Sequence, residues 1–183
     1  MKIRISFKKC SRFNPISAVT WFGSIKNKVA WRFNYCHTEL WLPDETFGFE
    51  INGLRLGKCF SARPDGVGFK SAEKVMHGFA WDYWEIEISQ EQYNAIMAFC
   101  NKESGDEYDY NGLMHFVLVY IAQDPNKWYC SEVVGTVTYN IGIVNLLKYI
   151  VKDYIKITPR DLGLELFYKF GEPVEIEKGN KND

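Results

Sequence analysis

Alternating apolar and polar positions mark the clearest elements of the chain. Residues 2–7 place Ile3 and Ile5 against Lys2 and Arg4, which is the period of a half-buried strand. Residues 35–42 and 81–88 alternate in the same way and are rich in aromatic and β-branched side chains. A further alternation over 173–177 predicts a final edge strand.

A hairpin is expected after the strand at 35–42. Turn residues occupy 43–45, and 46–51 reads as the return strand. The pair Asn52-Gly53 indicates a tight turn, and a third strand is expected over 54–61. Three chain breakers between 63 and 68 predict a loop.

Helical spacing accounts for the rest of the pattern. The expected helices lie at 17–32 (short, with a loop), from Ser89 to about Cys100, at 111–122 (apolar nearly all round, hence buried), from Cys130 to about Tyr139, and from Thr158 as N-cap with Pro159 in its first turn. Residues 179–183 form a polar tail that we expect to be disordered. These elements predict an α+β fold, with a small antiparallel sheet packed against helices in a single domain over 1–178.

Length and composition fit that expectation. The chain has 183 residues, of which 46% are hydrophobic and 16% aromatic. No apolar run approaches the roughly 20 residues of a membrane helix, and the first residues read as a strand rather than a signal peptide. We therefore expect a cytoplasmic protein without a membrane span.

Five cysteines are present, at positions 10, 36, 59, 100 and 130. None forms a C-x-x-C pair, and no Cys/His set has metal-ligand spacing. Neither disulfides nor a metal or organic cofactor are expected.

The formal net charge of −1 conceals an asymmetry. Residues 1–38 carry eight basic side chains and no acidic one, whereas the remainder carries 14 basic and 23 acidic side chains. A basic face could bind phosphate, nucleic acid or an acidic polymer. We favour the alternative that the basic region pairs with acidic side chains of the same domain, because no nucleic-acid-binding motif is present.

Cys130 is the candidate nucleophile. It follows two aromatic residues and a turn at 124–126, and it opens an apolar stretch with helical character. In the first turn of a helix, unpaired backbone N–H groups and the helix dipole favour a thiolate. The alternative is a small buried hydrophobe, since free cysteines are among the most buried residues.

A cysteine nucleophile needs a base, and His37 is the best placed of three histidines. His77 lies in a loop-like segment and reads as a surface residue, and His115 lies in the apolar helix at 111–122 as a core residue. His37 lies within a strand, where His37, Glu39 and Trp41 share one face.

The return strand of the expected hairpin brings Glu50 near the level of His37. A carboxylate beside an imidazole fixes its tautomer and stabilises its protonated form. Glu50 is therefore the candidate orienting residue, against the alternative of a solvated strand position.

Four segments resemble the circularly permuted branch of the NlpC-type papain-like cysteine peptidases and amidases. That branch includes the YiiX/YaeF-like proteins and, distantly, lecithin:retinol acyltransferase. The segments are the H-x-E-L strand at 37–40, Phe49-Glu50, the G-x-x-Y-D element at 105–109 and the aromatic-C-S-E element at 129–132. Residues 61–67 also resemble phage and viral members.

The resemblance implies a papain-like fold and a thiol hydrolase with Cys130 as nucleophile, His37 as base and Glu50 as third residue. It implies an acyl-enzyme formed on an amide or ester, with Tyr108 as an oxyanion donor or substrate contact. Peptides, peptidoglycan stem peptides and lipid esters are the implied substrates. The alternatives are a non-catalytic virion or host-interaction protein on the same fold, and a nucleic-acid-binding module that uses the basic region.

Overall fold

The computed structural model describes residues 1–10, 33–52, 54–111, 124, 126–151 and 154–176. Among these residues, six strands form one antiparallel sheet in the order β12-β7-β1-β2-β5-β6. The strands are β1 (Lys2–Lys9), β2 (Tyr35–Leu42), β5 (Lys58–Arg63), β6 (Gly66–Ser71), β7 (Trp81–Glu87) and β12 (Val174–Ile176). The predicted α+β class is confirmed, as are the strands at 2–7, 35–42 and 81–88 and the edge strand near the end of the chain.

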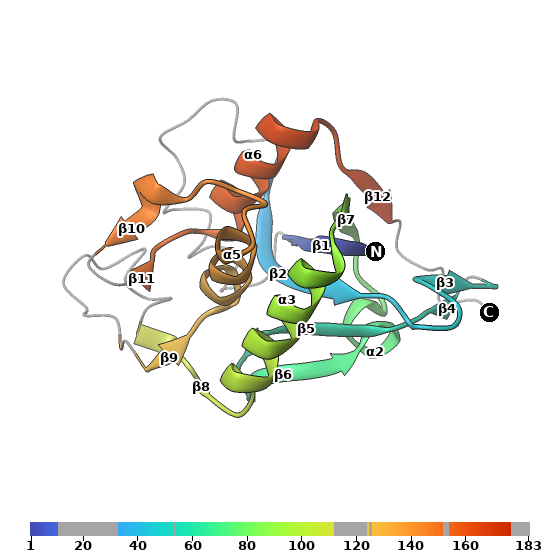
Figure 1. Ribbon diagram of the computed structural model, residues 1–183, viewed down its shortest axis with the longest axis horizontal. Helices are drawn as coiled ribbons and strands as arrows, with labels where there is room; N and C mark the ends of the chain where they lie inside the picture. Colours follow the sequence, from blue (N-terminus) through green and yellow to red (C-terminus); the bar gives the residue numbers. More distant parts are fainter. Residues whose placement is uncertain (11–32, 53, 112–123, 125, 152–153, 177–183) are drawn as a thin grey trace.

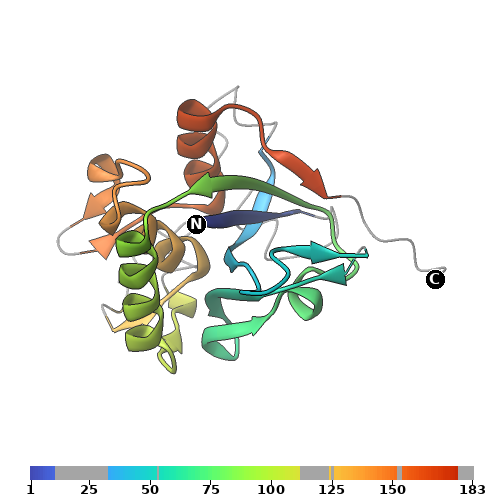
Figure 2. The same cartoon turned by 45° about the vertical axis from the view of Figure 1, so that its right-hand side comes forward.

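Helices cover the sheet from both sides. The helices are α2 (Ala72–Met76), α3 (Gln90–Glu103), α5 (Cys130–Asn140) and α6 (Pro159–Phe170), with a 3-10 turn η2 at Leu147–Tyr149. Figures 1 and 2 show α3 and α5 on one side of the sheet and α2 on the other. Three short two-stranded ladders complete the described chain: β3 (Glu50–Ile51) with β4 (Leu54–Arg55), β8 (Glu107–Tyr108) with β9 (Lys127–Trp128), and β10 (Ile150–Val151) with β11 (Tyr154–Ile155).

Strand alternation divides the interior into two cores. On one face of the sheet, residues such as Ile5 and Leu40 pack against Ile96 of α3 and Val133 of α5. On the other face, a smaller core surrounds Trp41 and includes Cys59, Ala72, Met76 and Trp81. Each fully buried large side chain contributes about 1.5–3 kcal/mol, so both faces stabilise the sheet.

Capping residues fix where α3 and α6 begin. Ser89 accepts a hydrogen bond from the N–H of Gln92, whose side chain accepts one from the N–H of Ser89, which completes a capping box. Thr158 caps α6 through the N–H of Asp161, with Pro159 at the first helical position. Both predicted helix starts are confirmed.

The predicted hairpin of 35–42 with 46–51 is wrong. Strand β2 pairs with β1 and β5, while β3 pairs with β4. The reason is visible at Gly57, where a Cβ would lie 2.0 Å from the carbonyl oxygen of Leu42. Only glycine allows so close a crossing, at a φ of 83°, and it lets β5 start beside the end of β2. Residues 66–68, expected in a loop, begin β6.

Three of the predictions fall on residues outside the described part of the chain. They are the short helix and loop at 17–32, the helix at 111–122 except for its first residue, and the disordered tail at 179–183. In the part of the chain that is described, no helix has both the length and the apolar character needed to cross a membrane.

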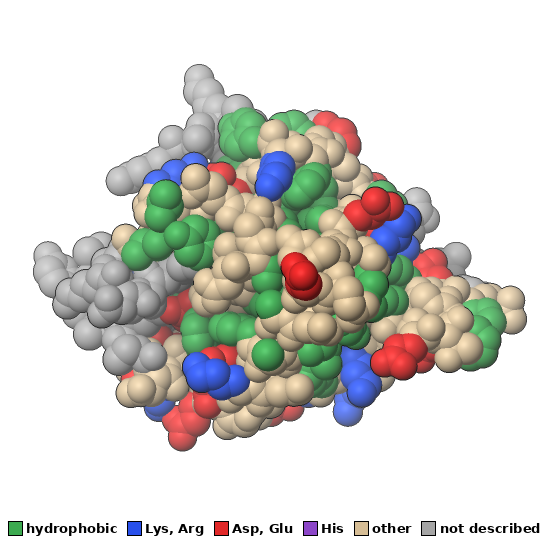
Figure 3. Space-filling model, viewed as in Figure 1, with side chains coloured by type: hydrophobic (Ala, Val, Ile, Leu, Met, Phe, Trp, Pro, Cys, Tyr) green, Lys and Arg blue, Asp and Glu red, His purple; other side chains and the backbone are tan. Residues whose placement is uncertain are grey.

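Basic residues of β1 pair with acidic residues from later in the chain. Lys2 and Arg4 both bind Glu85, at 2.7 and 3.1 Å. Lys9 binds Asp82 at 2.9 Å and also Glu175. On the face seen in Figure 3, side chains of both signs are interspersed. These ion pairs favour the explanation that the basic N-terminal residues are balanced by acidic side chains of the same domain. Lys8 is an exception.

Replacement of Gly163 tests the packing of α6 on the sheet. A Cβ at Gly163 would lie 2.8 Å from Cε2 of Tyr35, a buried ring whose hydroxyl donates to Asp82 at 2.6 Å. The overlap in Gly163→Ala should cost about 1–3 kcal/mol, more than the ~1 kcal/mol that alanine adds to helix propensity. We expect a net loss of stability in urea denaturation. The matched control is Gly68→Ala, where a Cβ meets nothing within 4 Å; equal stabilities of the two variants would contradict the close packing.

Candidate active site

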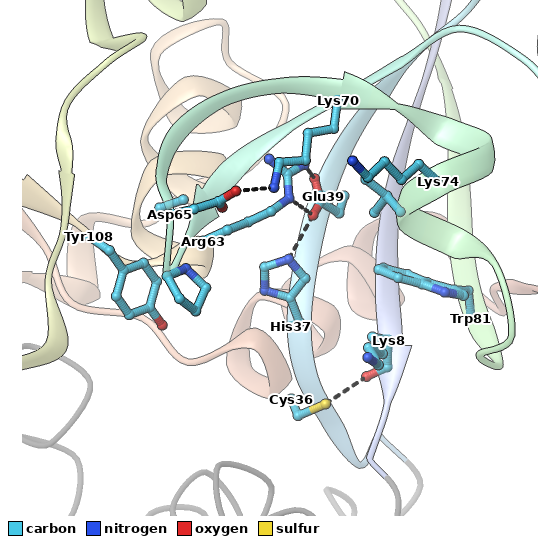
Figure 4. Close-up of a pocket in the computed structure, with 13 residues that line it drawn as sticks. Lys8, Cys36, His37, Glu39, Arg63, Asp65, Lys70, Lys74, Trp81 and Tyr108 are labelled. Atoms are coloured by element: carbon cyan, nitrogen blue, oxygen red, sulfur yellow. Dashed lines mark hydrogen bonds and ion pairs between the residues drawn. The ribbon is translucent and has the colours of Figure 1, made fainter.

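Strand alternation places His37 and Glu39 side by side on one face of β2. The distance between His37 Nε2 and Glu39 Oε1 is 2.7 Å. Arg63, the last residue of β5, reaches the same carboxylate from the neighbouring strand, with its Nε 2.9 Å from Oε1 and a further hydrogen bond to Oε2. Figure 4 shows the resulting chain of contacts from Arg63 through Glu39 to the imidazole.

The Arg63–Glu39 pair is buried and saturated with hydrogen bonds. The Glu39 side chain is 0% exposed and that of Arg63 is 10% exposed. The guanidinium also donates to the carbonyl oxygens of Gly68 at 2.9 Å and Cys59 at 3.3 Å. A buried carboxylate is costly unless it is paired and hydrogen-bonded, and here both conditions are met. The carboxylate of Glu39 is therefore held by Arg63 on one side and directed at His37 on the other.

Cys130 is the first residue of α5 and is 3% exposed. Its two neighbours in sequence, Tyr129 and Ser131, both form hydrogen bonds with the backbone of Ile157. The Tyr129 hydroxyl accepts from the Ile157 N–H at 3.1 Å, and Ser131 Oγ donates to the Ile157 carbonyl at 2.6 Å. These bonds explain the aromatic-C-S pattern, because they hold the first turn of α5 and hence the direction of the thiol.

Burial and the two neighbouring residues, Cys130 and Glu39, have opposite effects on the pKa of the His37 imidazole. Desolvation alone would lower the pKa of His37. The charge of Cys130 and a hydrogen bond with it, followed by the hydrogen bond and charge of Glu39, outweigh burial and raise the pKa to about 10. Since Glu39 occupies Nε2, the remaining nitrogen Nδ1 is the one available to the thiol. The imidazole is therefore a strong proton acceptor beside the Cys130 thiol.

Tyr108 lies next to this pair because β8 runs parallel to β9. Tyr108 pairs with Trp128, two residues before Cys130, and the Asp109 N–H donates to the Trp128 carbonyl at 2.8 Å. Burial, and then the charge of Cys130, raise the pKa of the Tyr108 phenol. The hydroxyl therefore stays protonated and can act as a hydrogen-bond donor.

A pocket of about 370 Å³ opens over His37. Its lining residues are Lys8, Cys36, His37, Glu39, Ala62, Arg63, Pro64, Asp65, Lys70, Lys74, Val75, Trp81 and Tyr108. Cys130 adjoins two of them, His37 and Tyr108. A small substrate group in this pocket would lie against the imidazole (Figure 4).

The structure brings together three of the four predicted site residues, Cys130, His37 and Tyr108. Glu50 is not among them, and the prediction that it orients His37 is wrong. Glu50 lies on β3 with its side chain 47% exposed and binds Arg4 at 3.2 Å. The prediction failed because it paired 35–42 with 46–51, whereas in the structure β5 runs beside β2. His77 is exposed, as expected, and His115 lies outside the described residues.

Glu39 takes the position assigned to Glu50. The sequence signal was present, since residues i and i+2 of a strand share a face. Arg63 was missed because its contact with Glu39 depends on the pairing of β2 with β5, which alternation alone does not specify.

One of three comparisons with known proteins bears on the fold. A scan against protein-family models finds no match, and a search of curated proteins finds none either. The chain resembles the crystal structure of the metalloprotein YiiX from Escherichia coli O157:H7, with a TM-score of 0.55, 15% sequence identity and 96% of each chain covered. The chain therefore has a YiiX-like fold, as its sequence motifs suggested.

The donor set of this site does not fit a metal ion. Both oxygens of Glu39 are engaged by Arg63, and one also by His37, so the carboxylate is already neutralised. Across the described ranges, no group of three or more His, Cys, Asp and Glu side chains is placed to hold a metal.

Removal of Arg63 should expose the cost of burying Glu39. Arg63→Met leaves a fully buried carboxylate with the His37 imidazole as its remaining side-chain partner, and we expect it to lower the free energy of unfolding by about 3–5 kcal/mol. The double variant Arg63→Met/Glu39→Leu should recover most of that loss, because no buried charge remains. Urea denaturation of the wild type, both single variants and the double variant measures the coupling; additive losses would contradict a mutually dependent pair.

Replacement of Cys130 should lower the pKa of His37. Cys130→Ala removes the two leading causes that raise the pKa, while burial still lowers it. We expect the imidazole to lose its proton at lower pH than in the wild type, where the value is about 10. NMR titration of the imidazole carbons measures this, with the exposed His77 as the internal control. Identical His37 curves in both proteins would show that Cys130 does not interact with the imidazole.

Proposed function

We propose that this protein is a cysteine-dependent hydrolase that cleaves an amide or ester through an acyl-enzyme. The observation that carries the proposal is the position of His37, between the thiol at the start of α5 and a buried, arginine-bound carboxylate. This arrangement meets the requirement for nucleophile, base and orienting group.

In the first half-reaction, His37 Nδ1 takes the proton of Cys130, and the thiolate attacks the substrate carbonyl. A C–S bond forms, and the π electron pair of the carbonyl moves to its oxygen, which becomes an oxyanion. Collapse of this intermediate breaks the bond to the amine or alcohol, which leaves with the proton from His37. In the second half-reaction, His37 deprotonates a water molecule that attacks the thioester, and the acid is released as the thiol is restored.

Two groups of this chain suit stabilisation of the oxyanion. The backbone N–H groups of the first turn of α5 lack acceptors within a regular helix, and the helix dipole adds positive potential there. The protonated hydroxyl of Tyr108 is the second candidate, in keeping with its position beside Cys130.

The YiiX-like fold and the resemblance of four sequence motifs to papain-like amidases support this proposal. The correction of the third residue from Glu50 to Glu39 leaves the chemistry intact, because a carboxylate still binds the imidazole. If an amine or alcohol replaced water in the second half-reaction, the same site would act as an acyltransferase.

Alkylation of the five cysteines tests the proposal. Cys130 should react with iodoacetamide rapidly below pH 7, because His37, whose pKa is raised, is placed to take the proton of the thiol. Cys59 and Cys100 are internal controls, since burial raises the pKa of both thiols, that of Cys100 to about 12. Mass spectrometry locates the labelled residues at each pH. A Cys130 that reacts no faster than these two would contradict the proposal.

The variants Glu39→Gln and Glu50→Gln separate the two candidates for the orienting residue. We expect Glu39→Gln to slow alkylation of Cys130 below pH 7 by about tenfold or more, because the imidazolium loses its adjacent charge. Glu50→Gln should leave the rate unchanged, since Glu50 binds Arg4 instead.

A further inference from the structure

Lys8 is the exception among the described basic residues of the N-terminal region. It lies directly across from His37 on β2 and from Trp81 on β7. Its ammonium nitrogen is 3.0 Å from the centroid of the Phe79 ring, and burial is the leading cause that lowers its pKa. Among the described residues, no carboxylate lies within ion-pair distance of Lys8, unlike its neighbours Lys2, Arg4 and Lys9.

The charges that line the pocket are only partly compensated. Arg63 is paired with Glu39 and Lys70 with Asp65. Lys74, on α2, lines the pocket as Lys8 does, and no described carboxylate lies within ion-pair distance of it. Figure 4 shows Lys74 extending toward the side where Glu39 and His37 lie. Lys8 and Lys74 therefore leave two positive charges beside the candidate active site.

Such an arrangement favours an anionic ligand. A partly desolvated ammonium group without a counter-ion costs free energy, which a bound anion recovers. A concave surface with low-dielectric walls also focuses the field of its charges on the ligand. The walls here include Trp81, Val75 and Pro64, so apolar side chains line the same pocket as the two lysines.

We propose that the substrate of this site carries an anionic group, a carboxylate or a phosphate, which Lys8 and Lys74 bind while the acyl carbonyl lies against Cys130. The inference rests on the proposed function and names its substrate class. Apolar atoms between the anion and the carbonyl would pack on the wall formed by Trp81 and Val75.

A pair of alkylating reagents of nearly equal size tests the anion site. Iodoacetate is negatively charged and iodoacetamide is neutral. The rate with iodoacetate divided by the rate with iodoacetamide therefore reports the electrostatic potential at Cys130. We expect Lys8→Gln and Lys74→Gln each to lower this ratio by about three- to tenfold at low salt, with a larger fall in the double variant. The ratio cancels any change in the reactivity of the thiol itself.

Lys58→Gln is the matched control, because Lys58 is exposed on β5 and does not line the pocket. It should keep the wild-type ratio. Rapid reaction with iodoacetamide, combined with one ratio shared by all the variants, would overturn the anion site alone. A Cys130 that reacts with neither reagent would overturn this inference and the proposed function together.

Competition distinguishes the two anions. At pH 5.5, where methyl phosphate and acetate each carry about one negative charge, both are added during alkylation of Cys130 by iodoacetamide. Protection at lower concentration by methyl phosphate assigns a phosphoryl group to the substrate, and the reverse order assigns a carboxylate. If neither protects Cys130 in the wild type more than in Lys8→Gln/Lys74→Gln, the anion site is overturned.

Discussion

The buried ion pair between Arg63 and Glu39 is the interaction on which the candidate active site depends. Glu39 has no exposed surface, so burying its carboxylate without a paired cation would cost free energy. Arg63 prevents this, and its remaining hydrogen bonds to Gly68 and Cys59 tie the guanidinium to β6 and β5. The electrostatics of His37 are thus fixed by the pairing of strands rather than by a mobile loop.

The thiol is positioned by an equally rigid but separate set of contacts. Tyr129 and Ser131 flank Cys130, and both bind the backbone of Ile157, just before α6. Trp128 joins Tyr108 in the short parallel ladder of β8 and β9. Two independent supports therefore converge on one contact, between Cys130 and His37. The hydrogen bonds on both sides of that contact hold the thiol and the imidazole in place, which the proposed chemistry requires.

Local patterns in the sequence were enough to predict much of the fold but only part of the site. Alternation identified β1, β2 and β7, and caps identified the starts of α3 and α6, because these features depend on neighbouring residues. Strand pairing depends on distant residues. The turn signal at 43–45 favoured a hairpin of 35–42 with 46–51, whereas the close crossing at Gly57 joins β5 to β2. That one error displaced the orienting carboxylate from Glu39 to Glu50 and hid Arg63.

The charge asymmetry of the chain acquires a physical explanation from β1. Side chains of this strand alternate, so Lys2, Arg4 and Lys8 share a face with His37 and Glu39 of β2. Glu85 on β7 binds the first two, and Glu50 also binds Arg4, but the residue opposite Lys8 on β7 is Trp81, which carries no charge. An acidic residue at that position would have cancelled the positive charge beside the imidazole. Because Trp81 occupies that position, the charge of Lys8 remains beside the pocket, where the proposed anionic substrate would bind.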